Sequence, residues 1–101
     1  MKIVILGLSV TSSWGNGHAT TFRALIKGLE ARGHEVLFIE RDMPWYAGNR
    51  DLRRIEGAEI RLYRSLGSLK RRFRAAVAGA DAVIVGSYVP DGIEVGEWVL
   101  R

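Results

Sequence analysis

The feature that most constrains the fold of this chain is a series of four short segments with strand character, separated by longer segments. Lys2–Leu8 (KIVILGL) is a continuous apolar run rich in β-branched residues, which is typical of a strand buried on both faces of a parallel sheet. Val36–Ile39 and Ala82–Val85 also predict strands, whereas Glu59–Tyr63 alternates and predicts a weaker strand. The chain is therefore expected to build its core around a sheet.

Apolar residues at helical spacing lie between and after these strands. The three predicted apolar stripes are Phe22, Leu25, Ile26 and Leu29, then Leu66, Leu69, Phe73, Ala76 and Val77, and finally Ile93, Val95, Trp98 and Val99. Gly33 follows the first stripe and predicts the end of that helix. Ser65 or Ser68 can cap the second helix, and Asp91 can cap the third.

This alternation predicts a single α/β domain over residues 1–101. Right-handed crossovers between consecutive strands make the sheet parallel, and the expected order of about four strands is 3-2-1-4, that of a Rossmann-like sheet with flanking helices. The last helical stripe is still running at Arg101, and the fourth strand would lie at a sheet edge. We therefore expect a truncated half-domain of a longer protein. The alternative is a small complete domain with a frayed C-terminal helix.

Composition narrows the functional classes. No apolar run reaches the roughly 18 residues of a membrane span, and the N-terminus leads directly into a strand without a signal-peptide pattern. The chain has no cysteine, which excludes disulfides and thiolate metal sites and is typical of a cytoplasmic protein.

The net charge of +4 comes from twelve Arg and three Lys against eleven acidic residues. The basic residues are densest at Lys70, Arg71, Arg72 and Arg74, and at Arg50, Arg53 and Arg54. Such a helix face is more often solvated surface than a nucleic-acid site, so no nucleic-acid partner is expected. Contact of this basic face with anionic membrane lipid stays open as an alternative.

Ligands of open parallel α/β sheets bind at the carboxyl ends of the strands, near the point where the strand order reverses. That rule selects three loops, Ser9–His18, Arg41–Asp51 and Gly86–Asp91. The first loop is longer than a connection requires, and its glycines lead into a helix N-terminus, which suits a phosphate or another anion. Its substrate-binding candidates are Ser12, Ser13, Trp14, Gly15, Asn16, Gly17 and Thr20. The alternative is a plain connection in which Thr20 caps the helix.

The second and third loops add further substrate-binding candidates. Trp45 and Tyr46 could stack on a sugar or an apolar acceptor, and Asn49 and Arg50 could bind hydroxyls or anions. The alternative is that the two aromatic side chains pack over the sheet edge and hold the loop in place. Ser87 and Tyr88, which follow the fourth strand, complete the set.

His18 is the candidate catalytic residue. At a helix N-terminus the helix dipole disfavours the imidazolium, so a neutral ring can accept a proton from a sugar or alcohol hydroxyl. Asp91 is the candidate carboxylate that orients the ring; the alternative is a histidine that hydrogen-bonds locally and does no chemistry. His34 is expected at a turn on the opposite edge of the sheet, which argues against a histidine-based metal site.

Three segments, in order, resemble the N-terminal part of two-domain GT-B glycosyltransferases of the CgeB-like family. They are GLSVTSSWGNGHATT at residues 7–21, ERDMPWYAGNRD at residues 40–51 and GSYVPDG at residues 86–92. The resemblance covers nearly the whole chain. It implies a bilobed enzyme with two Rossmann-like domains, which moves a sugar from a nucleotide-sugar donor to an acceptor hydroxyl.

In that family the C-terminal domain holds most of the donor, and the N-terminal domain holds most of the acceptor, a sugar or another small molecule. Gly17 and His18 match the Gly-His pair that opens the first helix in several GT-B enzymes, where the histidine acts as a base or contacts the donor. This chain departs from the family because the donor-binding half is absent. The resemblance therefore implies that these 101 residues transfer no sugar alone and that the nucleotide-sugar donor belongs to the full-length protein.

Two other functions stay open. Glu40 stands where an acidic residue holds the ribose in dinucleotide-binding domains of the NAD type. Against this function, Gly15 and Gly17 come well after the end of the first strand, and Thr20 replaces the third glycine of G-x-G-x-x-G. The other alternative is a non-enzymatic interaction module that uses the basic helix face. The exposed edge strand also predicts self-association, as a dimer or a soluble oligomer.

Overall fold

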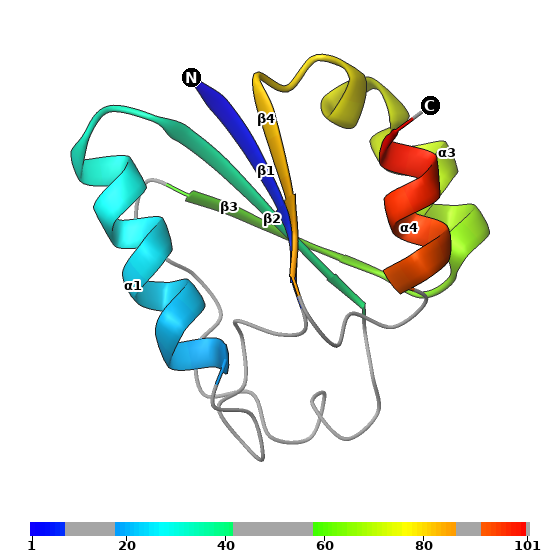
Figure 1. Ribbon diagram of the computed structural model, residues 1–101, viewed down its shortest axis with the longest axis horizontal. Coiled ribbons are helices and arrows are strands. Elements are labelled where there is room, and N and C mark those ends of the chain that lie inside the picture. Colours follow the sequence, from blue (N-terminus) through cyan, green and yellow to red (C-terminus); the bar gives the residue numbers. More distant parts are fainter. Residues whose placement is uncertain (8–17, 42–57, 87–91, 101) are drawn as a thin grey trace.

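The computed structural model describes residues 1–7, 18–41, 58–86 and 92–100. In chain order the elements are β1 (Lys2–Leu6), α1 (His18–Ala31), β2 (Glu35–Arg41), β3 (Ala58–Tyr63), α3 (Leu66–Ala78), β4 (Ala82–Val85) and α4 (Gly92–Val99). The four strands form one parallel sheet in the order β3-β2-β1-β4 (Figure 1). The predicted Rossmann-like α/β fold and its strand order are confirmed.

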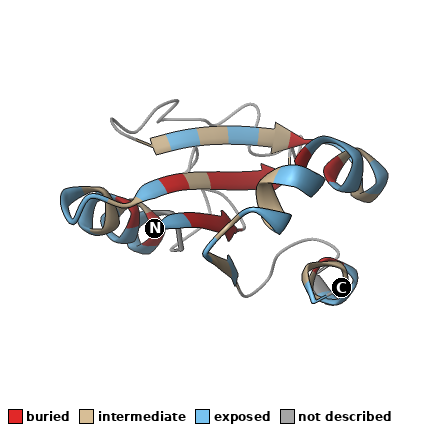
Figure 2. Cartoon of the chain, turned by 90° about the horizontal axis from the view of Figure 1, so that it is seen from above, coloured by how far each residue is buried: buried red, intermediate tan, exposed pale blue. Residues whose placement is uncertain are grey.

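The helices cover both faces of this sheet. Helix α1 packs on one face, and α3 and α4 pack on the other (Figure 1, Figure 2). The reason lies in the direction of the crossovers: β1 to β2 moves one way across the sheet, and β3 to β4 moves the other way. Because both crossovers prefer the right hand, their helices must lie on opposite faces.

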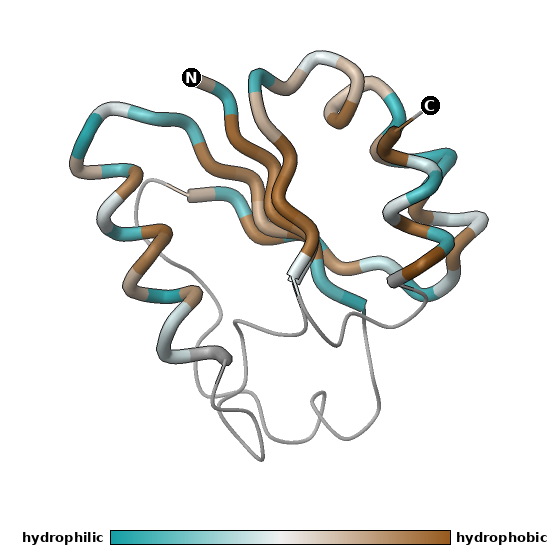
Figure 3. The backbone as a smooth tube through the Cα atoms, viewed as in Figure 1, coloured by the Kyte–Doolittle hydropathy of each residue, from teal (hydrophilic) through white to brown (hydrophobic). Residues whose placement is uncertain are grey.

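Alternation along the strands divides the core into two apolar clusters. The cluster under α1 contains Ile3, Ile5, Phe22, Ile26, Val36 and Phe38. The cluster under α3 and α4 contains Val4, Leu6, Ile39, Tyr63, Leu69, Phe73 and Val95. Strand β1 contributes to both clusters because it is central, and it is buried on both faces as its continuous apolar run predicts. Figure 3 shows this apolar centre as the brown stretch of the sheet.

The ends of the helices follow local chemistry. Gly33 has a φ of +84°, and the amide of His34 donates to the carbonyl of Leu29 at 3.1 Å, which is the hydrogen bond that closes a Schellman-type helix end. The predicted stop of α1 is therefore confirmed. At the start of α3, the Ser65 side chain accepts a hydrogen bond from the amide of Ser68 at 3.2 Å. Of the two serines that the sequence left open, Ser65 is the cap.

The element bounds differ from the predicted ones by one or two residues. Strand β2 begins one residue earlier and ends two residues later than Val36–Ile39, and β3 begins one residue earlier than predicted. Asp91, the predicted cap of α4, lies outside the described residues. No helix in the described ranges is both long and apolar enough to cross a lipid bilayer.

Candidate functional site

The carboxyl ends of β1, β2 and β4 meet at one edge of the sheet, and α1 begins at the same edge (Figure 1). Leu6 pairs with Ile39 on one side and with Val85 on the other. Beyond these pairs the backbone ladder continues for one residue: the amide of Gly7 donates to the carbonyl of Ile39 at 3.2 Å, and the amide of Gly86 donates to that of Leu6 at 2.8 Å. The hydrogen-bonded ladder at this edge therefore reaches Gly7 and Gly86.

Two glycines at this edge pack directly against aromatic rings. A Cβ atom on Gly7 would lie 2.8 Å from Cε2 of Phe38, and one on Gly86 would lie 2.8 Å from Cζ of Phe22. The two rings pack edge to face, with centroids 5.3 Å apart and an interplanar angle of 67°, a favoured arrangement. Any larger residue at either position would have to displace a ring.

This aromatic contact fixes the start of α1. Phe22 lies in the second turn of α1 and is buried against the ends of β1 and β4. His18 is the first residue of the helix, four positions before Phe22. The structure thus brings the first helical residue to the carboxyl edge that the sequence predicted.

The first turn of α1 has the electrostatic character of an anion site. It contains no acidic residue, so no side chain within that turn offsets the partial positive charge of the helix N-terminus. Thr20 and Thr21 are exposed there. The predicted substrate-binding residue Thr20 is therefore open to solvent at the expected edge.

Glu40 occupies an unexpected environment at the end of β2. Its side chain is fully buried, and no other charged residue in the described ranges is buried. Glu40 pairs in register with Leu62 of β3 and already has a polar partner within the chain. A carboxylate that holds a ribose in a dinucleotide site must instead reach the ligand, so the burial of Glu40 counts against that role.

The remaining predicted site residues lie outside the described ranges. They are Ser12, Ser13, Trp14, Gly15, Asn16, Gly17, Trp45, Tyr46, Asn49, Arg50, Ser87, Tyr88 and Asp91. His34 lies at the opposite edge, as predicted, and its Nδ1 is 3.2 Å from the terminal amino group of Met1. Among the described residues, no group of three or more His, Cys, Asp and Glu side chains could hold a metal ion.

The structural role of Gly7 and Gly86 was not deduced from the sequence. Gly7 directly follows Leu6, the last residue of the buried strand β1, and Gly86 directly follows Val85, the last residue of the edge strand β4. A glycine at the end of a parallel strand is a signal for close packing or for close approach of a ligand. The aromatic partners could not be identified, because Phe22 and Phe38 belong to other elements.

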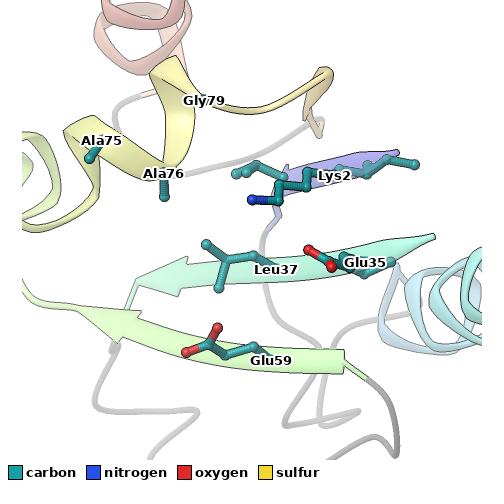
Figure 4. Close-up of a pocket in the computed structure, with 10 residues that line it drawn as sticks. Lys2, Glu35, Leu37, Glu59, Ala75, Ala76 and Gly79 are labelled. Carbon is teal, nitrogen blue, oxygen red and sulfur yellow. The ribbon is translucent and has the colours of Figure 1, made fainter.

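A hollow of about 250 Å³ lies at the opposite, amino-terminal edge of the sheet. Leu37 forms part of its floor, and the charged side chains of Lys2, Glu35 and Glu59 lie around it (Figure 4). Small residues at the end of α3, among them Ala75, Ala76 and Gly79, leave this space above the sheet. The hollow is a packing gap beneath the end of a helix and is remote from the carboxyl edge.

No family model, curated protein or solved structure matches this chain.

Proposed function

We propose that this chain is the N-terminal, acceptor-side domain of a GT-B-type glycosyltransferase of the CgeB-like kind. The observation that best supports the proposal is the position of His18. It begins α1 at the edge where the ends of β1 and β4 lie side by side, and the strand order reverses between these two strands. Ligands of doubly wound sheets bind at that reversal.

In the proposed reaction, His18 acts as the general base. The acceptor hydroxyl gives its proton to the imidazole and forms a bond to the anomeric carbon of the donor sugar. The bond from that carbon to the nucleotide phosphate breaks, and the nucleoside phosphate leaves with the electron pair. Asp91 orients the imidazole, and the start of α1 stabilises negative charge on the departing phosphate.

The three candidate loops supply binding in this proposal. The hydroxyls of Ser12, Ser13 and Thr20 and the backbone at Gly15 and Gly17 contact the donor phosphate or the acceptor. From the other loops, Trp45, Tyr46, Asn49, Arg50, Ser87 and Tyr88 surround the acceptor. A second Rossmann-like domain of the full-length protein holds the rest of the nucleotide sugar, so the 101 residues alone are expected to transfer no sugar.

The dinucleotide-binding alternative is less well supported. Its best feature was Glu40 at the end of β2, but this carboxylate is fully buried and already partnered within the chain. The pattern Gly15, Gly17 and Thr20 also lacks the third glycine of the dinucleotide fingerprint.

The deciding experiment measures donor turnover by the full-length protein with a panel of nucleotide sugars. It compares the wild type with two histidine variants. His18→Ala should lower donor turnover about 100-fold or more, the scale of a lost general base. His34→Ala is the matched control, because His34 lies at the opposite edge beside the N-terminus and its loss should leave turnover unchanged.

Each other outcome has a distinct meaning. If His18→Ala leaves turnover unchanged, the proposed glycosyltransferase activity stands, and His18 has a structural role only. Absence of turnover with every donor, together with binding of NAD, would overturn the proposal in favour of a dinucleotide-binding domain. Sugar transfer by the 101-residue chain alone would refute the division of labour between two domains.

A further inference from the structure

A groove runs between α3 and α4 on the face of the sheet opposite α1. Its lining consists of Lys70, Arg71, Arg74, Val77, Ala78, Trp98, Val99 and Leu100. The two helices that form it lie next to each other in both views (Figure 1, Figure 2). The groove is remote from the carboxyl edge, so it is independent of the proposed glycosyl-transfer site.

Three cations line one wall of the groove. Lys70, Arg71 and Arg74 are exposed, and their spacing of three and four residues places them on one side of α3. In the described ranges, none of the three forms a salt bridge or a hydrogen bond through its side chain. No acidic residue lines the groove. Contacts among the described residues therefore leave these three charges available to a ligand.

Arg72, the fourth cation of this helix, shows the contrast. One of its guanidinium nitrogens donates to the carbonyl of Leu62 at 2.9 Å, and its guanidinium carbon lies 5.0 Å from the ring centroid of Phe73. Arg72 thus ties α3 to β3. Its neighbours have no comparable structural task.

The opposite wall of the groove is apolar. Trp98 and Val99 are only half-buried although they belong to the apolar cluster beneath the helices, and Leu100 is 89% exposed. Trp and Leu beside several Lys and Arg residues form the pattern of helices that lie in a membrane interface, where the indole sits at headgroup level and the cations contact anionic lipid.

We propose that the groove between α3 and α4 docks on an anionic phospholipid surface. Lys70, Arg71 and Arg74 bind lipid phosphates, while Trp98 and Leu100 insert beside them into the interface. The apolar wall favours this occupant over nucleic acid, because an exposed aliphatic side chain such as Leu100 has no role on a phosphate backbone. Basic charge and apolar insertion together also meet the requirement for two signals in stable membrane association.

The test is co-sedimentation of the chain with vesicles of phosphatidylglycerol and phosphatidylcholine, compared with vesicles of phosphatidylcholine alone. The chain should bind the anionic vesicles and not the neutral ones. In the variant Arg71→Glu with Arg74→Glu, affinity should fall at least about 25-fold, since each basic residue near an anionic surface contributes roughly a factor of five.

The matched control is Lys27→Glu with Arg32→Glu. These two exposed residues lie in α1 and in the turn directly after it, on the other face of the sheet, and the pair changes the net charge by the same amount. The control should lose less than about fivefold. Equal losses in the two double variants would overturn the proposal, because the attraction would then depend only on net charge.

The apolar wall is tested separately with Leu100→Ser. Because this side chain is 89% exposed, its replacement leaves the core intact, and it should weaken vesicle binding most at high salt, where electrostatic attraction is screened. No binding to anionic vesicles at low salt would refute the proposal. Binding of duplex DNA without binding of vesicles would also refute it and assign the groove to nucleic acid.

Discussion

At the scale of single residues, the contact between Gly86 and Phe22 is the most constrained feature of the candidate site. A Cβ atom at position 86 would lie 2.8 Å from the Cζ of Phe22, so Gly86→Ala must displace the ring that positions the start of α1. We expect the free energy of unfolding to fall by about 1–3 kcal/mol, the usual range for overpacking a core. Denaturant unfolding followed by circular dichroism measures this change.

Two further variants separate packing from glycine's conformational freedom. In a Phe22→Leu background the same Gly86→Ala change should cost less, because the smaller side chain leaves room for the methyl group. Gly28→Ala is the control: Gly28 is exposed within α1 with no atom within 4 Å of an added Cβ. It should raise the free energy of unfolding by about 0.5–1 kcal/mol. An equally stabilising Gly86→Ala would show that the aromatic contact does not require glycine.

At the scale of the secondary-structure element, the N-terminus of α3 depends on one side chain. Ser65 has extended backbone angles, and its hydroxyl accepts the hydrogen bond from the amide of Ser68. Ser65→Ala should lower the free energy of unfolding by about 1 kcal/mol, since it removes the cap. Ser68→Ala keeps the amide that donates and should change stability less. Thermal or denaturant unfolding of both variants checks the assignment, and equal losses would contradict it.

At the scale of the whole molecule, the two edge strands of the sheet, β3 and β4, differ in how well they are protected against pairing with another chain. Edge strand β3 carries Glu59 and Arg61, both exposed and joined by a 2.6 Å ion pair, and such charges discourage pairing with another chain. Edge strand β4 (AVIV) carries no charge, and its Ile84 is 39% exposed. Antiparallel pairing of two copies centred on Ile84 would place only apolar residues and glycine opposite one another. We therefore expect self-association through β4.

Sedimentation velocity over a range of concentrations tests this expectation. The chain should form a dimer as concentration rises, and Ile84→Lys should shift it to the monomer. Leu25→Lys is the control, because Leu25 is 38% exposed but lies on α1, away from the edge. A monomer at all concentrations, or an equal effect of the two lysine variants, would contradict pairing through β4.

The sequence by itself determined the elements, their order and the parallel sheet, because these depend on local patterns. The apolar runs of Lys2–Leu6 and Ala82–Val85 specify strands, and Gly33 ends its helix through bonds to residues only a few positions away. Alternation of strands with helices then leaves few topologies. The edge at which α1 begins, with His18 as its first residue, was predictable for the same reason.

Only the tertiary structure decided which distant residues meet. The packing of Gly7 and Gly86 against the Phe22–Phe38 pair, the burial of Glu40, and the apolar wall that Trp98 adds beside the cations of α3 all join separate elements. Periodicity shows which face of an element is apolar, but it does not show which side chain of another element fills that face. Such contacts arise from the crossing of helices over the sheet, and that geometry exists only after the chain has folded.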